Sequence, residues 1–118
     1  MKEKLFDSEV KIMEILWEKG SLSAKEISLI AAETIGWNKN TTYTIIKKLI
    51  DKAFIQRDEP NFICTPLVSR EEVQKEEASS LLHKFFGGSR KALFSALIED
   101  EKLSDQEIEE LRDLIDKG

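Results

Sequence analysis

The chain has 118 residues, with 18 Lys and Arg against 23 Asp and Glu, and a formal net charge of −5 at pH 7. This length fits one domain, or a small domain with a helical extension, and 41% hydrophobic residues suffice for one modest core. No apolar run approaches the ~20 residues of a membrane span and the charged start is unlike a signal peptide, so we expect a cytoplasmic protein without a membrane partner. A single Cys and a single His exclude a disulfide framework and argue against a metal site. No cofactor is predicted.

The charges are unevenly placed along the chain. Residues 1–68 hold 10 basic and 10 acidic side chains, whereas residues 69–118 hold 8 basic and 13 acidic ones. Residues 38–57 contain five basic side chains against one acidic side chain. A basic segment therefore lies inside an acidic chain, and the net charge does not exclude nucleic-acid binding.

Two helices are predicted in the first 36 residues. Apolar residues at intervals of three and four predict a helix that begins after an N-cap at Asp7 or Ser8 and ends at Gly20. A short extended piece at 21–22 and the capping box at 23–26 then predict a second helix that ends near residue 36. The expected inward residues are Val10, Ile12, Met13, Leu16, Trp17, Ile27, Ile30, Ala31 and Thr34 or Ile35.

A third helix and a hairpin are predicted next. Asn38 can cap a helix from Lys39 to about Lys52. Its expected inner face is Thr42, Ile45, Ile46, Leu49 and Ala53. Two β-type runs at 54–57 and 62–65 are separated by four residues typical of a turn, and Pro66 ends the second run.

Three more helices complete the predicted order. Capping boxes at 69–72 and 104–107 begin two of them, and Ser89, directly after Gly87-Gly88, begins the third. The fold class is therefore mainly α with a small β-hairpin wing. We interpret residues 1–68 as a winged helix-turn-helix domain for DNA binding and residues 69–118 as a C-terminal helical dimerisation domain.

The outer face of the third helix is the candidate functional surface. Asn can pair with adenine, Thr can donate to a base edge or place its methyl group against thymine, and Lys can reach guanine or a phosphate. On the hairpin, Arg57 and Asn61 are best able to reach phosphates. The candidate DNA-binding residues are Lys39, Asn40, Thr41, Tyr43, Thr44, Lys47, Lys48, Arg57 and Asn61. The alternatives are an ordinary solvated face, or a winged-helix protein-interaction adaptor without sequence-specific DNA binding.

The C-terminal helices carry broad apolar faces in too little chain for a closed monomeric core. The candidate dimerisation residues are Leu81, Leu82, Phe85, Phe86, Leu93, Phe94, Leu97, Ile98, Ile108, Leu111 and Ile115. A homodimer would cover them, and the alternative is packing back onto the winged helix.

Cys64 is interpreted as a small packed residue rather than a redox switch. No phosphate loop, catalytic His or Cys pair, or metal spacing indicates an enzyme.

Several motifs together resemble the penicillinase and copper-responsive repressors of the BlaI/MecI/CopY type. The family's recognition-helix pattern is similar to the segment Trp37-Asn38-Lys39-Asn40-Thr41-Thr42-Tyr43-Thr44-Ile45-Ile46-Lys47-Lys48-Leu49. Further similar segments are Ser8-Glu9-x-x-x-x-x-x-x-Trp17, Thr65-Pro66-Leu67-Val68-Ser69 and Leu103-Ser104-x-x-x-Ile108-Glu109-Glu110-Leu111.

The resemblance implies a homodimeric repressor of a palindromic double-stranded DNA operator. The third helix, about residues 39–52, would enter the major groove, and the hairpin wing would contact the backbone. The release signal is unidentified, with proteolysis of the C-terminal region by a regulatory protease as one route. The family's Asn-Phe cleavage bond is replaced by Ala96-Leu97, and the Cys-x-Cys motifs of copper-responsive members are absent. Ala53 stands where a Gly commonly ends the recognition helix.

Overall fold

The computed structural model describes residues 4–100 and 103–117, with side chains described up to residue 113 apart from that of Asp100. The chain forms two compact units, one that ends at Gln74 and one that begins at Lys75. Among the described residues, no helix is both long and apolar enough to cross a membrane.

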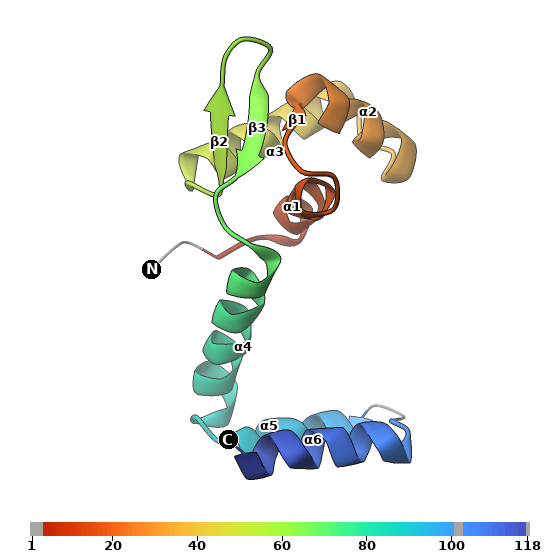
Figure 1. Ribbon diagram of the computed structural model, residues 1–118, viewed down its shortest axis with the longest axis vertical. Coiled ribbons are helices and arrows are strands. Elements are labelled where there is room, and N and C mark those ends of the chain that lie inside the picture. Colours follow the sequence, from red (N-terminus) through yellow and green to blue (C-terminus); the bar gives the residue numbers. More distant parts are fainter. Residues whose placement is uncertain (1–3, 101–102, 118) are drawn as a thin grey trace. The chain divides into compact units, whose positions relative to one another are not determined.

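The first unit holds three helices and three short strands (Figure 1). They are α1 (Asp7–Lys19), β1 (Leu22–Ser23), α2 (Ala24–Thr34), α3 (Lys39–Asp51), β2 (Ile55–Asp58) and β3 (Ile63–Pro66). The first residues of α4 (Arg70–Phe86) also belong to this unit. This is a mainly helical fold with a β-hairpin wing, as the sequence predicts.

The sheet adds a third strand, β1, to the predicted hairpin, and β1 overlaps the short extended piece predicted at 21–22. Its order is β1-β3-β2, and both pairings are antiparallel. Cys64 on the central strand lies between Leu22 of β1 and Arg57 of β2. The hairpin strands begin one residue later than predicted, so that Phe54 precedes β2 and Phe62 precedes β3. The pairing with β1 joins the base of the wing to the segment that leads into α2.

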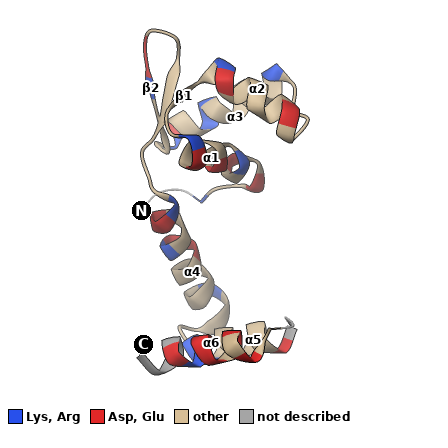
Figure 2. Cartoon of the chain, turned by 45° about the vertical axis from the view of Figure 1, so that its right-hand side comes forward, with Lys and Arg blue, Asp and Glu red and all other residues tan. Residues whose placement is uncertain are grey.

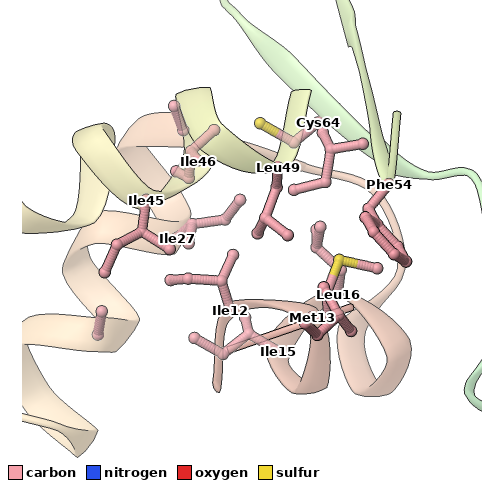
Figure 3. Packing of buried hydrophobic residues seen from close by; sticks show 14 of the residues in the cluster. Ile12, Met13, Ile15, Leu16, Ile27, Ile45, Ile46, Leu49, Phe54 and Cys64 are labelled. Atoms are coloured by element: carbon pink, nitrogen blue, oxygen red, sulfur yellow. The ribbon is translucent and has the colours of Figure 1, made fainter. Parts of the chain in front are cut away.

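The core lies between the three helices and the base of the hairpin (Figure 3). Ile12, Met13 and Leu16 of α1 are at most 1% exposed, and they pack with Ile27 of α2 and Leu49 of α3. These predicted inward positions are confirmed. Ile15 and Ile45 are also buried, whereas Val10, Trp17, Ile30 and Ile35 are half-buried at the edge of the cluster, and Thr34 is exposed.

Capping boxes begin α2, α4 and α6 where the sequence predicts them. At α2, the Glu26 amide donates to Ser23 Oγ at 3.1 Å and the Ser23 amide donates to Glu26 Oε1 at 3.2 Å. Ser69 with Glu72 and Ser104 with Glu107 repeat this reciprocal pair. Each box satisfies two backbone N–H groups that a helix start leaves without partners.

The start of α1 differs from the prediction. The N-cap is Phe6, and neither Asp7 nor Ser8 has this role. Glu9 folds back so that its Oε1 accepts from the Phe6 amide at 2.8 Å, and its side chain is 1% exposed. A buried carboxylate therefore fixes the first turn of α1, a contact that the helical pattern of apolar residues does not reveal.

The end of α3 also differs from the prediction. Ala53 is exposed and does not belong to the inner face. Its φ of 65° places it in the left-handed region, and the Phe54 amide donates to the Leu49 carbonyl at 2.9 Å. This hydrogen bond closes the helix in the manner of a Schellman motif. The position favours Gly, because a Cβ in left-handed backbone costs about 1 kcal/mol or more.

The second unit contains the rest of α4, then α5 (Arg90–Asp100) and α6 (Asp105–Lys117). Gly87 and Gly88 separate α4 from α5 with φ values of 55° and 82°, and Ser89 Oγ accepts from the Ala92 amide at 3.1 Å. Helices α5 and α6 contact each other. None of the side chains described in this unit is buried.

Candidate nucleic-acid interface

Asn38 sets where α3 begins and therefore which side chains lie on its outer face. Its Oδ1 accepts from the Thr41 amide at 2.8 Å, which confirms the predicted N-cap. Thr42 faces inward and is buried, and its hydroxyl donates to the Asn38 carbonyl at 3.3 Å. Because this hydroxyl has a partner inside the helix, a polar residue is tolerated in the core.

Most of the predicted DNA-binding residues of α3 are exposed. These residues are Lys39, Asn40, Thr41, Thr44, Lys47 and Lys48. Tyr43 is half-buried, so it is only partly available at the surface. The structure thus brings the predicted short polar groups and cations together on one helix face.

The lysines give this face its positive charge (Figure 2). In the described part of the chain, neither Lys47 nor Lys48 has a salt-bridge partner, and Lys39 Nζ lies 5.6 Å from the centre of the Tyr43 ring. Free ammonium groups on one face are suited to phosphate oxygens and guanine acceptors. The sole acidic residue of α3, Asp51, lies in its last turn, and among the described residues it forms no salt bridge with Lys47 or Lys48.

The hydroxyl proton of Thr44 is engaged in a hydrogen bond within α3. The hydroxyl donates to the Asn40 carbonyl of the same helix at 2.8 Å. The oxygen can still accept a hydrogen bond and the methyl group can still make an apolar contact. Of the two contacts predicted for Thr, the methyl contact with thymine is therefore the one this conformation favours.

An open hollow of about 420 Å³ lies beside the start of α3. Its lining residues are Ser8, Asn38, Asn40, Thr41, Thr44, Ile45 and Lys48. Hydroxyl, amide and ammonium groups surround one apolar side chain, a set of donors suited to an anionic or polar group. Sequence reasoning interpreted Ser8 as a possible N-cap of α1 and as part of a family-like segment, and so it missed the position of Ser8 beside the start of α3.

The two predicted wing residues lie in different surroundings. Arg57 of β2 has its guanidinium carbon 3.6 Å from the centre of the Phe62 ring, and its Nε donates to Glu59 Oε2 at 2.5 Å. The Arg57 guanidinium holds the pKa of Glu59 below its usual range, chiefly through this hydrogen bond. Asn61 is exposed in the turn with a φ of 75°. The Arg57 side chain is therefore restrained at the surface by its contacts with Phe62 and Glu59, whereas Asn61 lies in the turn at the tip of the wing.

Phe62 joins the wing to α3, and sequence reasoning missed it. Its ring contacts the Tyr43 ring edge to face, with 5.9 Å between the ring centres and 87° between the planes. The sequence placed Phe62 only as the first residue of a strand. Phe62 and Tyr43 are far apart in the sequence, so no local sequence pattern predicts their contact.

Cys64 is buried in the central strand, and burial raises the pKa of its thiol to about 11. A thiol that stays protonated at neutral pH is a poor metal ligand and a poor nucleophile. Among the described residues, no group of three or more His, Cys, Asp or Glu side chains could hold a metal ion.

The candidate dimerisation residues remain accessible in the single chain. Leu81, Phe85 and Leu97 are 42%, 67% and 40% exposed. Half-buried positions are Leu82, Phe86, Leu93, Phe94, Ile98, Ile108 and Leu111. The side chain of Ile115 lies outside the described residues. The single chain therefore leaves many apolar side chains of the second unit partly accessible to solvent.

Comparison with known proteins finds relatives along almost the whole chain. The penicillinase repressor family model matches residues 5–117. The penicillinase repressor of Staphylococcus aureus is 31% identical over 110 residues, which cover 92% of this chain and 87% of that protein. The methicillin resistance regulatory protein MecI of Staphylococcus aureus strain N315 is 30% identical over 116 residues, with 97% and 94% covered. The penicillinase repressor of Bacillus licheniformis is 23% identical over 116 residues, with 97% and 91% covered.

Two solved structures share the fold of the first unit. One is the solution structure of the DNA-binding domain of the repressor BlaI, with a TM-score of 0.55 and 24% identity over 61% of this chain and 93% of that chain. The other is monomeric BlaI of Bacillus licheniformis in complex with the blaP half-operator, with a TM-score of 0.53 and 22% identity over 61% and 90%. At these identities the likeness establishes the winged-helix fold alone.

Proposed function

The chain belongs to the penicillinase repressor family, and we propose that it is a homodimeric DNA-binding transcriptional repressor of a palindromic operator. In this proposal α3 enters the major groove and the β2–β3 wing lies on the DNA backbone. The observation that carries it is the cluster of exposed polar groups and lysines on the outer face of α3, where Lys47 and Lys48 have no salt-bridge partner among the described residues. The family is one of repressors, and the chain is not proposed to be an enzyme.

In this proposal, the side chains near the start of α3 contact the bases. The amide of Asn40 can make two hydrogen bonds to adenine, and the Thr44 methyl group can contact thymine. Lys47 and Lys48 lie further along the same helix, where ammonium groups can reach phosphates or guanine. The fold resembles that of BlaI bound to its half-operator, which supports this docking mode without identifying the operator of this chain.

The second unit is proposed to form the dimer. Its described apolar side chains are exposed or only half-buried in one chain, and a second copy of the same helices would cover them. A twofold dimer places two copies of α3 on one face of DNA, which requires an operator with two half-sites related by a dyad. Binding to chromosomal DNA is expected in the cytoplasm.

Release of the operator is proposed to follow a separate signal. One route is cleavage in the C-terminal region by a regulatory protease, which would separate the two chains. The bond at the family's cleavage position, Ala96-Leu97, lies inside α5. A protease would therefore require local unwinding of α5 before cleavage.

Fluorescence anisotropy with labelled DNA tests the proposal. We expect the protein to bind a fragment of its own promoter region at least about a thousand-fold more tightly than a scrambled fragment at near-physiological salt. Equal affinity for the two fragments would exclude sequence-specific repression. No affinity for either fragment at ~50 mM salt, where phosphate contacts are strongest, would favour the protein-interaction adaptor instead.

A pair of variants distinguishes a specific contribution of the α3 face to DNA binding from a general effect of positive charge. Lys47→Ala should weaken binding to both fragments and reduce the slope of log affinity against log salt by about 0.9, because one phosphate contact is lost. The matched control is Lys19→Ala, which removes an exposed lysine from the last turn of α1. The control should leave the slope unchanged.

A further inference from the structure

A row of aromatic rings and cations connects α3 with β2 and with the residue that precedes β3. Lys39 lies over the Tyr43 ring at 5.6 Å, and Tyr43 contacts the Phe62 ring edge to face at 5.9 Å between centres. The Arg57 guanidinium lies over the same Phe62 ring at 3.6 Å. Phe62 is therefore the one member of this row that touches both a proposed groove residue and a proposed backbone residue.

The backbone at Phe62 is held in a conformation that a bulky residue rarely adopts. Its φ is 51°, in the left-handed region that residues with a Cβ rarely adopt because of steric strain. The Phe62 carbonyl accepts from the Ala24 amide at 2.9 Å, which ties this residue to the start of α2. Strain of this kind persists where surrounding contacts fix it, and it often marks a functional position.

The stacking restricts Arg57 without blocking its donors. An arginine side chain on an exposed strand has many rotamers, and ordering it on binding lowers affinity. A guanidinium stacked on a ring face keeps its N–H groups in its own plane, pointing away from the ring. One of these donors bonds to Glu59, which shows that the stacked geometry can present a hydrogen bond to an anion.

We propose that Phe62 is a positioning residue for DNA binding, which holds Arg57 of the wing and Tyr43 of α3 in one fixed arrangement. This inference rests on the proposed function, since both neighbours are placed at the DNA. It goes beyond that function because it couples the groove contact and the backbone contact through one ring. A loss of the ring should therefore affect both contacts, although Phe62 itself need not touch DNA.

A purely structural role for Phe62 predicts different behaviour. The ring is half-buried against the core cluster, so its removal could simply loosen the fold. In that case operator affinity would fall with stability, and the dependence on salt would keep its slope. The two roles are therefore separated by the salt slope and by coupling to Arg57, rather than by affinity alone.

The test measures the affinity for the promoter fragment by fluorescence anisotropy at several salt concentrations. It uses single and double variants that remove the Phe62 ring or the planar guanidinium of Arg57. Phe62→Leu keeps an apolar side chain and should weaken binding about five-fold, with a smaller salt slope. Phe62→Tyr keeps the ring and should retain most of the affinity. Arg57→Lys keeps the charge and the contact between Phe62 and Tyr43, yet should weaken binding about three-fold because a lysine cannot stack on the ring as a plane.

The double variant Phe62→Leu with Arg57→Lys decides between the roles. We expect it to be weaker than Phe62→Leu by less than the full Arg57→Lys effect, because both changes remove the same stacking. Full additivity, or a Phe62→Leu protein with an unchanged salt slope, would overturn the inference. Wild-type binding by Arg57→Lys would overturn it even where Phe62→Leu does not fold. A wild-type protein that fails to prefer its promoter would instead refute the proposed function.

Discussion

Glu9 in the first turn of α1 and Lys52 at the end of α3 form a salt bridge inside the first unit, with 2.7 Å between Oε1 and Nζ. Their side chains are 1% and 14% exposed. The same ammonium donates to the Lys4 carbonyl at 3.1 Å. This pair fixes the far end of the candidate recognition helix to α1, so it contributes to where the helix face points.

Removal of one partner of this pair should be costly. Lys52→Met leaves the Glu9 carboxylate buried without its counter-charge, and we expect a loss of about 3 kcal/mol in the free energy of unfolding. Glu9 Oε2 has no hydrogen-bond partner among the described residues, which leaves little to compensate. Urea denaturation followed by circular dichroism measures the loss. The matched control is Lys48→Met, an exposed lysine of the same helix, and equal stability of the two variants would contradict this account.

Thr44 tests which group of α3 reads a base. Because its hydroxyl proton is bonded to the Asn40 carbonyl, we expect the methyl group to make the contact with DNA. Thr44→Ser should weaken operator binding about four-fold, which corresponds to one buried methyl group. Thr44→Val, which keeps the methyl group, should stay within about two-fold of wild type. The reverse order of the two variants in an anisotropy titration would show that the hydroxyl reads the base.

Glu59 should limit the affinity of the wing for phosphate. The Arg57 donor that bonds to Glu59 must be shared with or given up to a DNA phosphate, so Glu59→Gln should raise affinity for any DNA about two- to five-fold. The control is Glu14→Gln, which breaks a similarly exposed pair with Arg70. An equal gain from both variants would point to net charge alone and contradict the specific role of Glu59.

The pH dependence of this effect follows from the lowered pKa of Glu59. Arg57 keeps the carboxylate ionised below the ordinary value of 4.5, so its contribution to folding is present above that value and is lost as the pH falls through the lowered pKa. The difference in DNA affinity between wild type and Glu59→Gln should therefore be constant between about pH 6 and pH 8. A difference that disappears toward pH 6 would show that the carboxylate takes up a proton there.

Two phenylalanines of equal exposure test the dimer. Phe85 in the second unit and Phe6 in the first are both 67% exposed. Phe85→Ser should raise the dimer dissociation constant about ten-fold or more, because an aromatic side chain would be lost from the proposed interface. Phe6→Ser should leave it unchanged. Sedimentation at micromolar concentration distinguishes the outcomes, and a monomeric wild-type protein would refute the dimer directly.

The sequence predicts those parts of the fold that depend on neighbouring residues. The capping boxes at Ser23, Ser69 and Ser104 and the cap at Asn38 each need only three residues of spacing, and all four are confirmed. The same local reasoning placed the N-cap of α1 at Asp7 or Ser8, because it could not know that Glu9 would be buried and bonded to Phe6.

Contacts between distant segments were not predictable in the same way. Lys52 and Glu9 are 43 residues apart, and neither residue type nor spacing marks them as a pair. The extended piece predicted at 21–22 is observed as β1 at Leu22–Ser23, but two residues contain no pattern that would predict its pairing with β3. The candidate DNA-binding face could be predicted because helical periodicity indicates which residues share a helix face, and its role stays a prediction. The Tyr43–Phe62 contact between α3 and the wing could be identified only in the folded chain.

Hydroxyl-radical footprinting on the promoter region tests the central claim most directly. A dimer of winged helices that places two copies of α3 in successive major grooves should protect two symmetric patches on one face of the DNA, centred about 10 base pairs or a multiple of that spacing apart. Lys47→Ala should reduce protection of both patches equally. Uniform weak protection without a dyad, or a single protected patch at saturating protein, would contradict a homodimeric repressor that reads a palindromic operator.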